Sequence, residues 1–81
     1  MKIKEFITFF KEYLEIENTE ITLETEFLSI SEFDSLGRMT LIALVDEHFE
    51  KKIKAQDFNN LIKIRDLVKH IGIENFEDYH D

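Results

Sequence analysis

The chain has 81 residues, with two glycines, no proline and no cysteine. A chain of this length has room for one hydrophobic core, and the lack of cysteine excludes disulfides and cysteine-rich zinc sites. Ten basic and eighteen acidic residues give a formal charge of −8, which disfavours binding to nucleic acid and to anionic membranes. The charge fits a basic protein partner, but it also fits a small domain that simply needs to stay soluble.

The sequence predicts neither a membrane-spanning nor a secreted protein. The segment 1–5 lacks the apolar region of a signal peptide, and no stretch approaches the roughly 20 apolar residues of a membrane span. We therefore expect a cytoplasmic protein without stable membrane insertion, organised as a single monomeric domain over residues 1–81.

Residues 2–16 predict the first helix. Apolar residues recur there at three- and four-residue steps between charged ones, which is the pattern of an amphipathic helix. Phe9 and Tyr13 widen this apolar stripe, as expected for a helix packed against two neighbours. The stripe consists of Ile3, Phe6, Ile7, Phe10 and Leu14.

Residues 17–34 show no helical period and are rich in serine, threonine and asparagine, which favour turns and local caps. Their apolar residues would suit a strand, but no convincing partner strand exists elsewhere in the chain. We predict a long loop held against the core by apolar anchors, namely Ile21, Leu23, Phe27, Leu28 and Ile30.

Residues 35–50 predict the second helix, with Asp34 or Ser35 capping its first turn. Its apolar residues extend around the cylinder, so either both faces are packed or one face awaits a partner. These residues are Leu36, Met39, Leu41, Ile42, Ala43, Leu44, Val45 and Phe49.

The remaining chain predicts a brief helical turn over 56–60 and a last helix that Gly72 ends. The fold class is therefore all-α, a small four-helix bundle with one short helix and a long loop between its first two helices. The helical core spans about residues 2–72. The acidic tail 73–81 either docks through Phe76 and Tyr79 or frays.

Ser35 is the candidate attachment residue, because it stands where the polar loop ends and the second helix begins. A helix start presents unpaired backbone N–H groups and the positive end of the macrodipole, so a phosphate ester there would be stabilised. A serine at this position is more commonly only a cap. Ser35 alone therefore does not decide between the two roles.

The enzymatic alternatives find little support in the residues. No G-x-S-x-G turn surrounds Ser35, which disfavours a serine hydrolase. The three histidines lack metal-motif spacing, and no twelve-residue loop matches an EF-hand. Structural or surface roles are the better reading of the histidines.

The ordered set of a long loop, Asp34-Ser35-Leu36 and an apolar-periodic helix resembles the acyl and peptidyl carrier proteins over about residues 3–72. By this resemblance Ser35 carries 4′-phosphopantetheine, with Asp34 and Leu36 beside it as part of the cofactor-binding element. The arm holds acyl or aminoacyl groups as thioesters, and the protein itself is not an enzyme. The implied partners are a phosphopantetheinyl transferase, a loading ligase, and acyl-processing or acyltransferase enzymes.

The chain departs from fatty-acid carriers in its second helix, where Gly37, Arg38 and Thr40 interrupt the usual acidic run. Arg38 then either sets partner choice or is a solvated surface charge. The partner-binding residues that we expect are Leu36, Arg38, Met39, Asp46 and Glu47. We also expect an apolar chamber for an aliphatic chain, lined by Phe27, Leu28, Ile42, Val45 and Ile64.

The resemblance leaves the cargo open. Fatty-acid and lipid biosynthesis, polyketide, peptidyl and D-alanyl carriers all fit, and the Ser-Leu-Gly run suggests a specialised or D-alanyl type. The alternative is an acidic helical interaction module that binds a basic or amphipathic partner without any prosthetic group.

Overall fold

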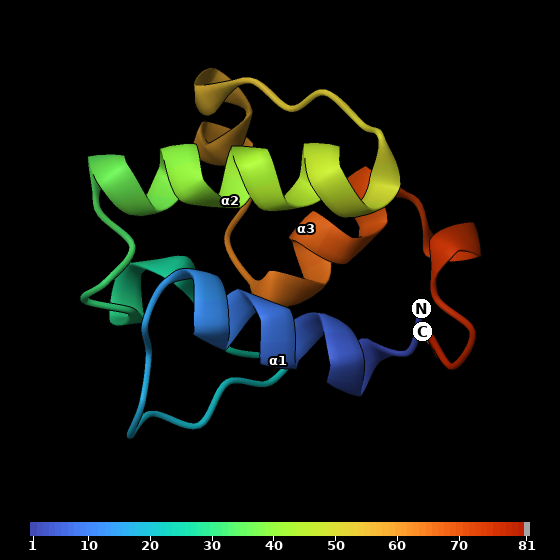
Figure 1. Cartoon of the computed structure of the whole chain (residues 1–81), viewed down its shortest axis with the longest axis horizontal. Helices are drawn as coiled ribbons and strands as arrows, with labels where there is room; N and C mark the ends of the chain where they lie inside the picture. Colours follow the sequence, from blue (N-terminus) through green and yellow to red (C-terminus); the bar gives the residue numbers. More distant parts are fainter. Residues whose placement is uncertain (81) are drawn as a thin grey trace.

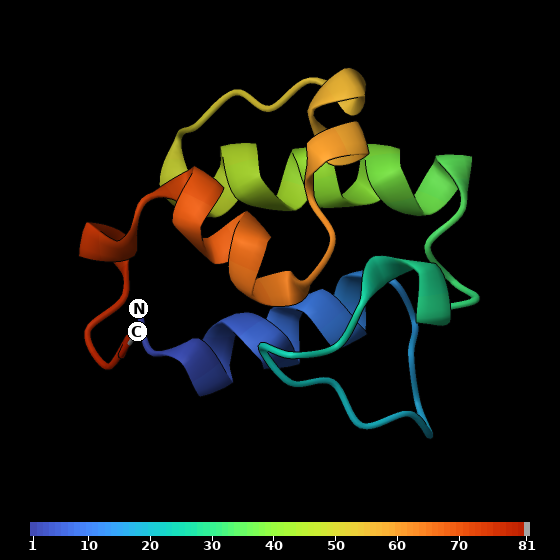
Figure 2. The ribbon, with the colours of Figure 1, turned by 180° about the vertical axis from the view of Figure 1, so that it is seen from behind.

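The computed structural model describes residues 1–80 and shows a small helical bundle. Its α-helices are α1 (Ile3–Tyr13), α2 (Ser35–Phe49) and α3 (Ile64–Ile71), and its 3₁₀ helices are η1 (Phe27–Ser29), η2 (Ala55–Asn60) and η3 (Ile73–Asn75). α1 and α2 run in opposite directions, and both views place α3 between them (Figures 1 and 2). The predicted all-α bundle is confirmed, with η2 as its short helix.

One core joins the three α-helices. Phe6 and Phe10 of α1 are fully buried, as the amphipathic stripe predicts. The Phe6 ring makes edge contacts with Phe49 and Phe76, at centroid distances of 6.0 and 5.5 Å. The other fully buried side chains are Leu41, Leu44 and Val45 of α2 and Ile64, Leu67, Val68 and Ile71 of α3.

α1 ends at Tyr13, so the predicted end at residue 16 is wrong by three residues. Glu15 adopts a left-handed conformation with φ of 57°, and the Ile16 amide donates back to the Lys11 carbonyl at 2.8 Å. This sharp exit buries both Leu14 and Ile16, whereas a continued helix would place them on different sides. The helix therefore ends where its exit allows the side chains of Leu14 and Ile16 to be buried together.

The connection between α1 and α2 is a loop held by apolar anchors, as predicted, but Leu28 is not one of them. Ile21, Phe27 and Ile30 are buried, whereas Leu28 is 96% exposed. Phe27 and Ile30 are three residues apart in and after η1, so they share a face, and Leu28 falls on a different one.

Backbone pairing also holds this loop, which sequence reasoning missed. The Phe27 amide donates to the Ile62 carbonyl at 2.9 Å, and the Arg65 amide donates to the Leu23 carbonyl at 2.8 Å. These bonds flank an isolated antiparallel bridge between Glu26 and Lys63. Hydrogen bonds from Arg65, and then from Lys63, lower the pKa of the Glu24 carboxyl.

Residues 73–80 dock against the start of the chain rather than fray. Gly72 ends α3 with φ of 117°, and Phe76 is buried. The Met1 amine donates to the Asn75 carbonyl at 3.0 Å, and the Ile3 amide donates to Asp78 Oδ1 at 2.9 Å. The two ends of the described chain therefore lie side by side (Figure 1). None of the helices in residues 1–80 combines the length and the apolar character needed to cross a bilayer.

Candidate functional site

At the start of α2, the residue that caps the helix is not the candidate attachment serine. Asp34 is the N-cap, and its Oδ1 accepts a hydrogen bond from the Gly37 amide at 2.9 Å. Ser35 is the first residue of the helix, and its side chain is exposed. Because Asp34 satisfies the cap, the hydrogen bonds of this turn leave the Ser35 hydroxyl uninvolved and open to an incoming group.

Gly37 allows the loop to lie directly on the first turn of α2. It is buried, and a Cβ atom at this position would collide with the Glu32 carbonyl oxygen and touch the Leu14 side chain. Only a residue without a side chain permits this approach. Sequence reasoning treated Gly37 as a break in an acidic pattern and missed this role. A glycine within the first turn of a helix, where alanine would be preferred, was the available signal.

Two apolar side chains next to Ser35 point into solvent. Leu36 is 72% exposed and Met39 is 67% exposed, while Gly37, Leu41, Leu44 and Val45 form the buried face of α2. Of the two possibilities for the apolar surface of this helix, the structure therefore shows a face left uncovered beside Ser35. Exposed apolar groups next to a reactive residue suit contact with a partner.

Asp46 and Glu47 lie at the other end of α2, roughly 17 Å along the helix from Ser35 at 1.5 Å per residue. Both carboxylates already have contacts within the chain. Asp46 pairs with Lys52 at 2.8 Å, and Glu47 accepts a hydrogen bond from the Tyr13 hydroxyl at 3.0 Å. That hydrogen bond, with partial burial and nearby negative charge, raises the pKa of Tyr13. The structure thus does not bring Asp46 and Glu47 together with Ser35.

Arg38 is half-buried, with its Cζ 5.7 Å from the centroid of the Phe33 ring. It borders a cavity of about 320 Å³ between the loop before α2 and the segment around η2. The other lining residues are Phe27, Leu28, Ile30, Phe33, Phe58, Asn59, Leu61 and Ile62. Arg38 is therefore not the fully solvated surface charge that one of the two sequence-based interpretations expected.

The expected chamber within the bundle is wrong in most of its lining. Phe27 and Leu28 border the cavity beside Arg38, but Ile42, Val45 and Ile64 do not. Val45 and Ile64 are fully buried in the packed core. Helical periodicity identified them as apolar and inward-facing, which describes a filled core as well as it describes a cavity wall.

A second hollow of about 220 Å³ lies on the other side of the α2 start, bordered by Asp34, Leu36, Gly37 and Thr40 of this element and by Tyr13, Leu14, Glu15 and Glu32. Residues on both sides of Ser35 in the chain therefore border hollows, Phe33 and Arg38 the one of about 320 Å³ and Asp34 and Leu36 the one of about 220 Å³.

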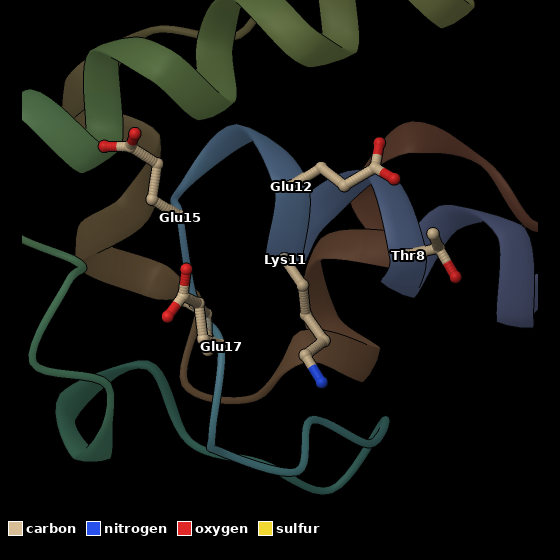
Figure 3. A pocket seen from close by; sticks show the side chains of 6 residues that line it. Thr8, Lys11, Glu12, Glu15 and Glu17 are labelled. Carbon is tan, nitrogen blue, oxygen red and sulfur yellow. The ribbon is translucent and has the colours of Figure 1, made fainter.

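A larger hollow of about 500 Å³ lies along the outer face and the end of α1, and shares Glu15 with the hollow just described. In Figure 3 the Glu12 and Lys11 side chains diverge from each other, so the charged groups do not converge on one ligand. In the part of the chain that the structure describes, histidine and acidic side chains form no cluster able to hold a metal ion. We therefore assign no ligand or metal ion to this hollow.

The geometry at Ser35 fits a phosphodiester. An exposed hydroxyl, a separate cap residue and the free N–H groups of the first helical turn are what such an anion requires. The family model described as "Phosphopantetheine attachment site" matches residues 4–71. Comparisons with curated proteins and with solved structures give no significant match.

Members of that family carry 4′-phosphopantetheine covalently on a serine. The match spans α1, the long loop, α2, η2 and α3, so it covers the complete arrangement that places Ser35. This chain therefore belongs to the phosphopantetheine-binding family of acyl and peptidyl carrier proteins.

Proposed function

We propose that Ser35 is the residue of this chain that carries 4′-phosphopantetheine, and that the protein presents acyl or aminoacyl thioesters to partner enzymes of a biosynthetic pathway. The observation that carries the proposal is the division of roles at the start of α2. Asp34 caps the helix, so the exposed hydroxyl of Ser35 is available for modification. When bound, the group supplies a terminal thiol that holds the cargo.

Local electrostatics support a phosphodiester on Ser35. The first-turn N–H groups and the positive end of the α2 macrodipole stabilise an anion there. Asp34 lies next to the attachment point, where we expect it to help place the transferase and its metal ion. The chain has no cysteine, so no thiol of the protein competes with the thiol of the arm.

The modification itself tests the proposal. Incubation with coenzyme A and a broad-specificity phosphopantetheinyl transferase is expected to raise the intact mass of the wild-type chain by one phosphopantetheine. Ser35→Ala is expected to abolish the shift, because the attacking oxygen is gone. Ser31→Ala is the matched control, since Ser31 is an exposed serine just before the same helix, and it should be modified like the wild type.

Failure of the folded wild type to gain mass, with a reference carrier modified in the same reaction, would contradict the proposal. That result would favour the acidic interaction module, which needs no prosthetic group. Modification of Ser35→Ala would equally overturn the assignment of the site.

Leu36 and Met39 are the centre of the partner surface that we propose. They are the exposed apolar side chains next to Ser35, so any enzyme that reaches the serine or its arm meets them first. Asp46 and Glu47 would contact basic partner groups at the far end of α2, in keeping with the charge of −8. Loading and acyl-processing enzymes would dock on the same face.

Truncation of either apolar side chain is expected to slow modification without unfolding the protein. Leu36→Ala and Met39→Ala should each lower kcat/KM of the transferase about tenfold, the effect of losing a buried interface contact. Ile73→Ala is the matched control, because Ile73 is an exposed apolar residue in η3 rather than beside Ser35. Equal rates for all three variants, with unchanged circular dichroism, would place the partner surface elsewhere.

We expect this carrier to act in the cytoplasm as one monomeric domain over residues 1–81. Its place in fatty-acid, polyketide, peptidyl or aminoacyl metabolism depends on the cargo.

A further inference from the structure

Phe33 joins three segments of the chain at a point two residues before Ser35. The centroid of its ring lies 4.7 Å from that of Phe27 in η1 and 5.3 Å from that of Phe58 in η2. Phe27 and Phe58 also contact each other at 6.1 Å, so the three rings form a closed cluster. Phe27 and Phe58 are buried, whereas Phe33 is only half-buried. The end of the long loop is therefore anchored on the core immediately before the attachment residue.

Arg38 contacts the same ring from α2. Its Cζ lies over the Phe33 ring, 5.7 Å from the centroid, within the range of a cation–π contact. Its backbone amide donates to the Asp34 carbonyl at 2.9 Å, which fixes the residue in the first turn of the helix. In the chain, Phe33 precedes Ser35 by two residues and Arg38 follows it by three. The contact therefore joins the loop to α2 across the attachment residue.

An arginine is a costly side chain for this contact. Its Nε has no exposure to solvent and no hydrogen-bond partner. Asp34, the nearest acidic residue in the chain, accepts from the Gly37 amide instead, and no carboxylate within residues 1–80 forms an ion pair with Arg38. A buried N–H without a partner destabilises the folded state, and an apolar side chain of similar shape avoids that loss. Folding stability alone therefore does not explain an arginine at this position.

A guanidinium supplies a fixed geometry that an apolar side chain lacks. It is planar and stacks on aromatic faces by dispersion and cation–π attraction, so it restricts the ring beneath it. A flexible side chain such as methionine fills similar space but adapts to several arrangements. Proteins tolerate local losses of stability at functional sites, where the geometry itself is what is needed.

We propose that Arg38 is a positioning residue for the modification of Ser35. By holding Phe33, it fixes how the loop enters α2 and therefore how the Ser35 hydroxyl faces the transferase. The inference rests on the proposed attachment at Ser35.

The transfer step explains why this orientation matters. The Ser35 oxygen forms a bond to the phosphorus of coenzyme A that bears pantetheine, and the bond from that phosphorus to adenosine 3′,5′-bisphosphate breaks. The hydroxyl proton passes to a base of the transferase. The oxygen must be aligned with the phosphorus, and small displacements from such an alignment slow a reaction strongly.

Arg38→Met tests the proposal, because it keeps an apolar contact with Phe33 and removes the planar cation. Single-turnover modification is followed by intact mass over a range of excess transferase. The limiting rate is expected to fall about tenfold, whereas the transferase concentration that gives half of this rate should stay within about twofold of wild type. The urea midpoint should not fall, because the variant removes the unpaired N–H. A merely structural role predicts the opposite, a lower midpoint and an unchanged limiting rate of the folded chain.

Two further variants test whether Arg38 acts through Phe33. Phe33→Leu keeps apolar volume but removes the face of the ring, and it should slow the limiting rate to a similar extent. Because the two residues form one contact, the double variant should be slowed about tenfold rather than about a hundredfold. Lys51→Met is the matched control, since it removes an exposed positive charge beyond the far end of α2 and should react like the wild type.

The outcomes separate this inference from the proposed function. If the wild type is modified and Arg38→Met reaches the same limiting rate, the positioning role is overturned while attachment at Ser35 stands. If only the half-saturating concentration rises, Arg38 contacts the transferase directly and the positioning role is also overturned. A double variant slowed about a hundredfold would overturn the assignment by showing that Arg38 acts independently of Phe33. If the folded wild type gains no mass, the proposed function fails and this inference fails with it.

Discussion

Replacing Phe6 with alanine is expected to lower the free energy of unfolding by about 3 to 5 kcal/mol, the range measured for large aromatic truncations in cores. Phe6 is fully buried, and its ring contacts both Phe49 at the end of α2 and Phe76 in the docked tail. The change therefore opens a cavity where three segments meet. Because small domains have only about 5 to 15 kcal/mol of stability, this variant should be close to unfolding. Urea denaturation followed by circular dichroism measures the loss.

Leu28→Ala is the matched control for Phe6→Ala. Leu28 is also a large apolar residue, but it is exposed, so its truncation should change stability by less than about 0.5 kcal/mol. A loss below about 1 kcal/mol for Phe6→Ala would contradict a core centred on this ring. Separate unfolding transitions for α1 and for the rest of the chain would contradict the single core.

Gly37→Ala is expected to destabilise the protein by about 1 to 3 kcal/mol, the usual cost of overpacking. Helix propensity alone predicts the opposite, a gain of up to about 1 kcal/mol for alanine over glycine. The collision of the new Cβ with the Glu32 carbonyl oxygen outweighs that gain, because a backbone carbonyl cannot move aside without moving the loop. The loop shift would also displace Asp34 and Ser35, so the rate of modification should fall along with stability.

The reverse substitution elsewhere in α2 isolates the propensity effect. Ala43 is exposed in the middle of the same helix, so Ala43→Gly should cost about 0.5 to 1 kcal/mol through propensity alone. A stabilised Gly37→Ala variant would show that the loop does not pack on the first turn of α2.

Local sequence patterns were enough to predict the helices. The helices were predicted from features that involve only residues close together in the sequence. These are the spacing of Phe6 and Phe10, the apolar run of the second helix and the position of Gly72. Such short-range features do not depend on how the helices pack against one another. The position of Ser35 at the start of the second helix was predicted in the same way, because a helix start is a local property of the sequence.

The errors arose where distant segments meet. Leu28 was expected in the core, but η1 turns it outward so that Phe27 and Ile30 can be buried together. Val45 and Ile64 were expected to line a chamber, but close packing between helices fills that space. No local pattern distinguishes a filled interior from a hollow one, because both are lined by apolar residues.

By itself, the sequence determined the all-α fold, the single core and the start of α2 at Ser35, since these follow from periodicity, composition and capping. Only the tertiary structure decided that Asp34 rather than Ser35 caps the helix, that Gly37 meets the Glu32 carbonyl, and that Arg38 borders a cavity with its Nε unpaired. Each of these depends on how close the loop comes to α2, and that distance is set by packing across the whole domain.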